Sequence, residues 1–231
     1  MSSEPRRARS QTVRKNWQGE LDKKPMGLRE RHKLDKLERI SAAAISLFGR
    51  EGYEGTTLRD IAREADVALG TLSLYARDKR DLVLMIFNKV IPPLLERGRK
   101  NTNSTHRLAE NMVAFFEPFY RAYAKNVTLF RIILGQVYNG PPSGHAAQND
   151  AIRVELLGVL SDFILHAVAT GECRSDVDLE IQSRSFFYLY FAAVRVWLYQ
   201  EKPDPEQGLK DLSELYEHHV PSLIPPRMRK A

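Results

Sequence analysis

The spacing of apolar residues constrains the fold of this 231-residue chain more than any other feature. Beyond the N-terminal tail, apolar residues recur at intervals of three and four. No segment sustains the alternation of β-branched and polar residues that is typical of a half-buried strand. The sequence therefore predicts an all-α fold whose helices are separated at Gly, Pro and Asp residues. We expect helices over residues 34–50, 58–65, 68–76, 106–125, 127–138, 149–170, 179–200 and 205–219, and a connecting helix that is kinked or ended by Pro92-Pro93.

The segment from Thr57 to Asp60 has the pattern of a capping box. In this motif the Thr57 hydroxyl accepts a hydrogen bond from the Asp60 amide, and the Asp60 carboxylate accepts one from the Thr57 amide. A short helix therefore begins at Leu58 and breaks at Asp66, a residue type that tolerates a left-handed turn. Two short helices that are joined by a tight turn and braced by a longer preceding helix form a helix-turn-helix. The second helix of this motif can enter a DNA major groove.

The residues between Ile40 and Leu82 include Phe48, Gly52-Tyr53, Thr56-Thr57, Ile61-Ala62, Ala65, Val67, Gly70-Thr71-Leu72, Tyr75, Lys79 and Leu82. This set resembles the N-terminal domain of the tetracycline-repressor (TetR) family, and the similarity covers about a fifth of the chain. The resemblance implies a three-helix helix-turn-helix domain at residues 34–82. A helical ligand-binding and dimerisation bundle would follow at residues 83–220, with a C-terminal tail at residues 221–231.

The resemblance also implies that residues 68–76 form the recognition helix and that Lys79 begins a helix whose N-terminus abuts the DNA backbone. A helix N-terminus presents unpaired amides and a partial positive charge to a phosphate, and a lysine there adds a full charge. The expected DNA contacts are Thr57, Arg59, Leu69, Gly70, Thr71, Ser73, Leu74, Tyr75 and Lys79.

The expected DNA-reading surface departs from the family pattern at several positions. Ala68 stands where the family usually has Ser, which removes a helix cap that is typically worth about 1 kcal/mol. Ser73 stands where the family has Tyr, with the loss of a phosphate contact. Leu69 and Leu74 place aliphatic groups on the base-facing side, where they can contact a thymine methyl but form no hydrogen bond. Base discrimination would then rest on few polar contacts.

The positive charge of the chain is concentrated at its N-terminus. Residues 1–33 hold ten Lys and Arg against four Asp and Glu, an excess of six that equals the net charge of the whole chain. A basic, apolar-poor segment buries too little surface to offset its ordering entropy, so we expect a disordered arm that is attracted to polyanions. Two interpretations stay open: a solubilising tail, or an arm that contacts DNA phosphates or lies in a minor groove.

The C-terminal region is rich in aromatic residues at helical spacing, most of which we expect in an ordinary core. A subset can line an apolar ligand pocket: Phe115, Phe119, Tyr123, Phe130, Phe163 and Tyr190. The arginines that lie beside apolar stretches, any one of which could hold a carboxylate ligand, are Arg121, Arg131, Arg153 and Arg195.

The helix expected near residues 179–200 is apolar around most of its circumference and must be covered on all sides. One of its faces can pair with a second copy of the chain, for which Phe187, Val194 and Trp197 are the expected interface residues. The other interpretation is a helix at the centre of a monomer core.

The sequence gives no support for catalysis or metal binding. Cys173 is the single cysteine, and the six histidines show no zinc-ligand spacing. No nucleophile elbow or phosphate-binding loop is present, so we expect neither an enzyme nor a cofactor. The chain has no apolar run long enough for a membrane span or a secretory signal, and we expect a cytoplasmic protein.

These patterns favour a homodimeric, ligand-responsive transcriptional regulator that binds double-stranded operator DNA. The expected form is a repressor that a small organic effector releases from its operator. The alternative is a helical interaction protein whose helix-turn-helix has lost specific DNA binding.

Overall fold

The computed structural model describes residues 27–137 and 144–223. Over these residues the chain forms nine α-helices and a short 3-10 helix, which confirms the predicted all-α class. None of the described helices is both long and apolar enough to cross a membrane. The elements are α2 (Leu28–Gly55), α3 (Leu58–Glu64), α4 (Leu69–Ser73), α5 (Lys79–Asn101), α6 (Leu108–Lys125), α7 (Val127–Gln136), α8 (Ala146–Ala169), α9 (Leu179–Leu198), α10 (Pro205–His219) and η3 (Val220–Leu223).

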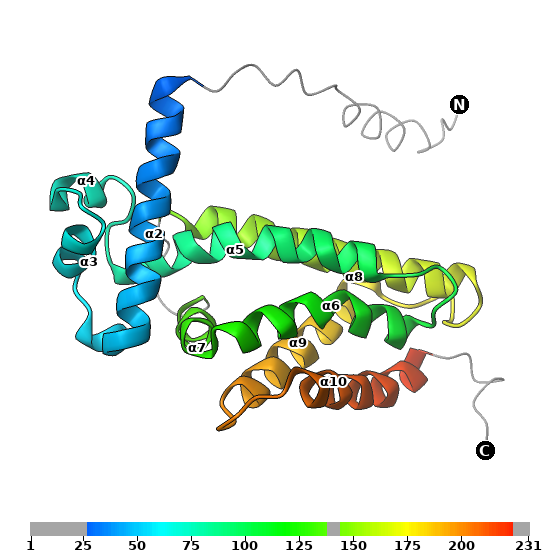
Figure 1. Cartoon of the computed structure of the whole chain (residues 1–231). Helices are drawn as coiled ribbons and strands as arrows, with labels where there is room; N and C mark the ends of the chain where they lie inside the picture. Colours follow the sequence, from blue (N-terminus) through cyan, green and yellow to red (C-terminus); the bar gives the residue numbers. More distant parts are fainter. Residues whose placement is uncertain (1–26, 138–143, 224–231) are drawn as a thin grey trace, which may run out of the picture.

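Helices α2, α3 and α4 form an N-terminal unit at one end of the molecule. In Figure 1, α2 crosses the end of α5, with α3 and α4 on the side of α2 away from the rest of the chain. The unit packs around Phe48 and Leu72, neither of which is exposed. Gly52 has a φ of 74°, a left-handed conformation that glycine adopts without strain, and it bends the chain near the end of α2. Apolar burial on α2 thus holds the two short helices in place.

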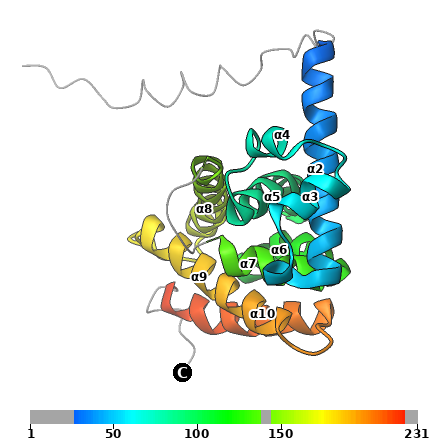
Figure 2. The same cartoon turned by 90° about the vertical axis from the view of Figure 1, so that its left-hand side faces the viewer.

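Helices α5 to α10 and η3 form the body. Helix α5 packs along α6 and α8, α6 packs on α10, and α8 packs on α9, as the two views in Figures 1 and 2 show. The contact between α5 and α6 is unusually close at Gly98, where an added Cβ atom would lie 2.3 Å from the Phe115 carbonyl oxygen. The body therefore has a closely packed core that is rich in aromatic residues.

Helix α5 joins the N-terminal unit to the body. The structure corrects the expectation that Pro92-Pro93 kinks or ends this helix, because α5 continues through both prolines to Asn101. The buried side chains of Ile91, Leu94 and Leu95 flank the prolines and pack against the body. This packing outweighs the loss of the backbone hydrogen bonds that proline cannot form.

Several helix ends differ from the predicted ones. Helix α2 begins at Leu28, so residues 28–33 are helical rather than part of a disordered arm. These residues are mostly good helix formers, and extending an existing helix requires no new nucleus. Helix α8 begins at Ala146 rather than at residue 149. The rest of the predicted arm, residues 1–26, the predicted break at residues 140–142 and the end of the tail, residues 224–231, lie outside the described residues.

Candidate nucleic-acid interface and effector cavity

The capping box at the start of α3 is formed as predicted. The Asp60 amide donates to the Thr57 hydroxyl oxygen at 3.2 Å, and the Thr57 amide donates to the Asp60 carboxylate at 3.3 Å. The Thr57 hydroxyl also donates to this carboxylate, and that hydrogen bond holds the pKa of Asp60 below its usual range. Arg63 pairs with the same carboxylate at 2.7 Å. These contacts fix the point at which α3 begins.

The turn between α3 and α4 is held by an arginine that sequence reasoning missed. Asp66 has a φ of 50°, the left-handed conformation that its residue type was expected to tolerate. The guanidinium of Arg39, on α2, donates to the Ala65 and Asp66 carbonyls and to the Asp66 carboxylate. Arg39 therefore satisfies carbonyls that the tight turn leaves without helical partners.

Helix α4 presents a mainly apolar surface to solvent. Leu72 and Ala76 are buried against the N-terminal unit, whereas Leu74 is 85% exposed and Leu69 is 39% exposed. Ala68 occupies the N-cap position and makes no side-chain capping bond, in agreement with the expected loss of a cap. The remaining exposed or half-buried candidates on this helix are Gly70, Thr71 and Ser73.

The other expected DNA contacts have different surroundings. Thr57 and Arg59 are exposed at the start of α3. Tyr75 is half-buried, and its hydroxyl donates to the Lys33 carbonyl of α2 at 3.4 Å. The Lys79 ammonium donates to the Tyr53 carbonyl at 2.6 Å and lies 4.5 Å from the centre of the Tyr53 ring. Lys79 thus braces the last residues of α2, beyond the bend at Gly52, a role that the sequence pattern did not indicate.

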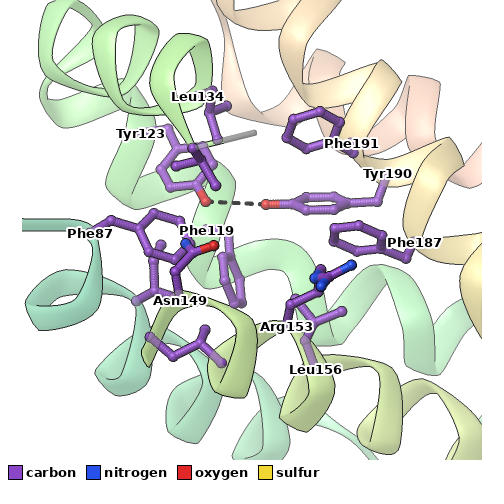
Figure 3. A pocket seen from close by; sticks show the side chains of 13 residues that line it. Phe87, Phe119, Tyr123, Leu134, Asn149, Arg153, Leu156, Phe187, Tyr190 and Phe191 are labelled. Carbon is purple, nitrogen blue, oxygen red and sulfur yellow. Dashed lines mark hydrogen bonds between the residues drawn. The ribbon is translucent and has the colours of Figure 1, made fainter. Parts of the chain in front are cut away.

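A small apolar cavity of about 30 Å³ lies inside the body. Figure 3 shows side chains from α5, α6, α7, α8 and α9 around it. Of the six expected pocket residues, Phe119, Tyr123 and Tyr190 line the cavity, whereas Phe115, Phe130 and Phe163 do not. Lining residues that sequence reasoning had not assigned to a pocket are Phe87, Ile91, Leu134, Val137, Asn149, Ile152, Leu156, Phe187 and Phe191.

The cavity wall carries a few polar groups. The hydroxyls of Tyr123 and Tyr190 lie 3.2 Å apart, and burial raises the pKa of Tyr190 well above its ordinary value. Asn149 is only 7% exposed, and no hydrogen bond joins its side-chain amide to the described residues. Arg153 has a buried Nε atom without a partner in the described part of the chain, while its Nη2 pairs with Asp150 at 2.9 Å. The wall therefore offers hydrogen-bonding groups that a ligand can use.

The structure separates the four candidate arginines. Arg153 lines the cavity, but Arg121 pairs with Glu117 and Glu206 outside it. Arg131 donates to the Leu198 and Gln200 carbonyls, and Arg195 donates to the Leu134 carbonyl. Arg131 and Arg195 thus join α7 to α9. Asn149 could have been found in the sequence, because it lies three residues before Ile152 on a stripe that is otherwise apolar.

The residues expected at a dimer interface are buried inside the subunit, so the prediction that they form a surface contact is wrong. Val194 is not exposed, and Trp197 is 1% exposed, packs on Tyr120 and donates to the Asp204 carbonyl at 2.7 Å. Phe187 is 5% exposed and lines the cavity. All three belong to the core of the subunit. The expectation failed because the sequence pattern alone does not show which stripe of an apolar helix faces its own domain.

A set of hydrogen bonds joins the start of α8 to the N-terminal unit. His145 directly precedes α8, and its Nε2 donates to the carbonyl of Tyr75, just beyond α4, at 2.8 Å. The His145 amide donates to the buried Asp81 carboxylate at 3.2 Å, and its carbonyl accepts from the Asn88 side chain at 2.9 Å. Asn149 of the cavity wall lies one helical turn further along α8. The cavity and the end of α4 are therefore linked through a single helical turn.

A capped helix, a tight turn and a short exposed helix define a DNA-binding protein of the helix-turn-helix class. Residues 40–86 match the family model described as "Bacterial regulatory proteins, tetR family". The match assigns the N-terminal unit to the TetR family of transcriptional regulators. This match favours the regulator over the alternative of an interaction protein that has lost DNA binding.

Similar proteins extend the match into the body. The chain is 19% identical to the "Fatty acid metabolism regulator protein" of Bacillus subtilis, over 74% of this chain and 88% of that protein. The structure of FadR from Thermus thermophilus, a TetR-family repressor in complex with lauroyl-CoA, is 23% identical, with a TM-score of 0.64 over 84% of this chain and 97% of that one. FadR from Bacillus subtilis, in complex with stearoyl-CoA, is 19% identical, with a TM-score of 0.62 over 81% and 97%. These likenesses establish a shared fold.

Proposed function

We propose that this protein is a dimeric repressor that leaves its operator when a fatty acyl-CoA, or a molecule of similar chemistry, enters the cavity. The observation that carries the proposal is the contact of His145 with Tyr75. It connects the helix that lines the cavity to the helix that faces DNA.

The chemistry of the cavity supports an amphipathic effector. Most of its wall is aromatic or aliphatic, which suits an acyl chain, while Asn149 can donate to a carbonyl oxygen and Arg153 can neutralise an anion. The effectors in the two FadR complexes are acyl-CoA thioesters, which have an apolar chain, a carbonyl and phosphates. The cavity is far below the roughly 300 Å³ at the lower end of ligand pockets, so an acyl chain must displace lining side chains.

This displacement suggests how the effector acts on DNA binding. Asn149 and Arg153 lie in the first turns of α8, the part of the helix nearest to His145. Movement of these turns away from α5 and α6 would pull His145 from Tyr75 and Asp81, and α4 would lose its present position. The effector then lowers DNA affinity because it binds the displaced conformation more tightly than the present one.

A second copy of the chain is the proposed partner, through faces of α8 and α9 other than the ones expected from the sequence. Val154 and Leu165 on α8 are 66% and 47% exposed, and Tyr188 and Val196 on α9 are 54% and 72% exposed. The two helices pack on each other and lie at the same side of the molecule in Figure 2. Neighbouring apolar stripes of this kind are typical of an interface between two subunits.

Binding-site selection from random DNA with the purified chain tests the DNA-binding part. We expect a site with two-fold symmetry whose half-sites lie about 10 base pairs apart, because two recognition helices enter successive major grooves. Enrichment of no sequence would reject operator binding.

Titration of the selected complex with lauroyl-CoA, lauric acid and free CoA tests the effector. We expect lauroyl-CoA to release the DNA, and release by lauric acid alone would show that the acyl chain and its carboxylate suffice. If none of the three changes DNA affinity, the effector class is wrong.

The Asn149→Leu variant separates ligand contact from folding. The substitution removes a buried amide that has no hydrogen-bond partner among the described residues, so we expect equal or higher stability. Operator affinity should stay within about twofold, whereas the lauroyl-CoA concentration for half-release should rise about tenfold, as for the loss of one hydrogen bond to a polar ligand group. An unchanged release curve would contradict the role of Asn149.

A further inference from the structure

Helix α4 exposes two neighbouring rows of residues with little hydrogen-bonding capacity. The spacing of four places Leu69 beside Ser73 in one row and Gly70 beside Leu74 in the next. Both leucines are exposed, and Leu74, at 85%, is the most exposed of the large apolar side chains in the described residues. A surface of this kind is unusual for a helix that faces DNA, because specific base contacts are mostly hydrogen bonds.

Two of the polar side chains on and next to α4 are engaged within the protein, whereas no hydrogen bond joins the half-buried Thr71 hydroxyl to the described residues. The Ser73 hydroxyl donates to the Leu69 carbonyl at 3.1 Å. The Tyr75 hydroxyl donates to the Lys33 carbonyl at 3.4 Å. A hydroxyl has one hydrogen to donate, so neither group has a free donor for a base edge in this arrangement.

Gly70 adds a second, independent observation. Its backbone does not have a positive φ, and a Cβ atom added to it would meet no other atom within 4 Å. Nothing inside the subunit therefore requires glycine at this helical position, where it costs roughly 1 kcal/mol relative to alanine. A glycine on an exposed helix surface permits the close approach of a group from outside the subunit.

We propose that α4 recognises its operator chiefly through the 5-methyl groups of thymine, which Leu69 and Leu74 contact in the major groove. The thymine methyl is the one apolar group on the major-groove edges of the four bases, so aliphatic side chains without donors can discriminate only by contacting it. This inference rests on the proposed operator binding and adds the chemical feature of the DNA that is recognised.

The experiment uses the full chain and the DNA site that selection from a random pool yields. Deoxyuridine differs from thymidine only by the absent methyl group, and it keeps the same hydrogen-bonding pattern. We expect replacement of single thymines by deoxyuridine to weaken binding about three- to fivefold at each contacted position, the value of one buried methyl group. Replacement of the same T·A pair by 5-methyl-dC·dG should bind better than replacement by dC·dG, because the methyl is restored.

Protein variants assign the methyl contact to a residue. In the Leu74→Ala variant, deoxyuridine at one thymine of each half-site should no longer reduce affinity, since the contact is already absent. Leu69→Ala should remove the effect at a different thymine. Leu215→Ala is the matched control: Leu215 is an exposed leucine of α10, and its variant should show the full deoxyuridine effect. Both α4 variants should fold, because they shorten solvent-exposed side chains.

The outcomes distinguish this inference from the proposed function. If selection enriches a site but deoxyuridine at every thymine leaves affinity unchanged, methyl recognition is wrong and operator binding stands. The same holds if deoxyuridine lowers the affinity of the wild type and of both leucine variants equally. If selection enriches no site, operator binding and methyl recognition are both rejected.

Discussion

At the scale of single residues, two helical glycines show that the reason for a glycine depends on the atoms around it. Gly98 and Gly70 both lie inside helices, yet a Cβ atom at Gly98 would collide with the Phe115 carbonyl, whereas one at Gly70 would meet nothing. Gly98 is explained by packing within the subunit. No contact within the subunit explains Gly70, and a surface that approaches from outside would explain it.

The Gly70→Ala variant tests that distinction. We expect the free energy of unfolding to rise by roughly 0.5–1 kcal/mol, because alanine is the better helix former. Operator affinity should fall about tenfold, since the added methyl keeps α4 from its closest approach to DNA. Denaturant unfolding and a gel-shift titration measure the two quantities. Gly49→Ala, at an exposed position of α2 that also has open space, should gain stability with no change in DNA binding.

Cys173 provides a prediction about pH. Burial, with a smaller contribution from Glu172, raises the pKa of this thiol to about 11. Free thiols titrate near 8.5. With a pKa of about 11, by contrast, only about one molecule in a thousand of the folded protein carries the thiolate at pH 8. Reaction with a disulfide reagent should be slow at pH 8 and should speed up about tenfold per pH unit toward 11.

The same shift makes folding pH-dependent at alkaline pH. The folded state holds the thiol proton more tightly than the unfolded state, so the contribution to stability is complete below about pH 8.5 and is lost as the pH rises toward 11. Rapid labelling at pH 8 that matches the rate in denaturant would contradict the burial of Cys173.

At the scale of elements, α8 is the helix that connects the cavity to the N-terminal unit. Its first turns line the cavity, and the residue that precedes it contacts the end of α4. His166, near the other end of the same helix, makes the same kind of bond, from its Nε2 to the Ser104 carbonyl at 3.0 Å. The two histidines thus make the same kind of hydrogen bond at opposite ends of α8.

His145→Ala should uncouple the effector from DNA. We expect lauroyl-CoA to bind the variant with nearly unchanged affinity, because the cavity wall is intact. Release of DNA should become at least about threefold weaker, which corresponds to a loss of roughly 0.7 kcal/mol of coupling. Calorimetry measures effector binding and gel shift measures release. The control variant His166→Ala should release DNA normally. Normal release in both variants would show that His145 does not couple effector binding to DNA release.

At the scale of the whole molecule, the proposed dimer must hold its two N-terminal units at a fixed separation to bind one operator. Val196→Arg places a charge in the exposed stripe of α9, where burial at a subunit interface would be costly. We expect a monomer by light scattering and a loss of operator affinity of at least about tenfold, because two half-sites no longer bind together. Leu215→Arg, at an exposed position of α10, should stay dimeric, and a dimeric Val196→Arg protein would place the interface elsewhere.

The sequence by itself determined the local structure. The order of the helices, the capping box of Thr57 and Asp60 and the left-handed turn at Asp66 depend on residues within a few positions of one another. Apolar periodicity and hydrogen-bonding side chains report such short-range interactions directly.

The tertiary structure alone decided which side chains meet across the fold. It placed Asn149 and Arg153 in the cavity wall, buried Val194 and Trp197 in the subunit, and turned Lys79 toward Tyr53 rather than toward solvent. It also joined His145 to Tyr75, which lie 70 residues apart in the chain. Contacts of this kind depend on how whole helices pack, and the spacing of residues within one helix carries no information about the neighbour that will cover each face.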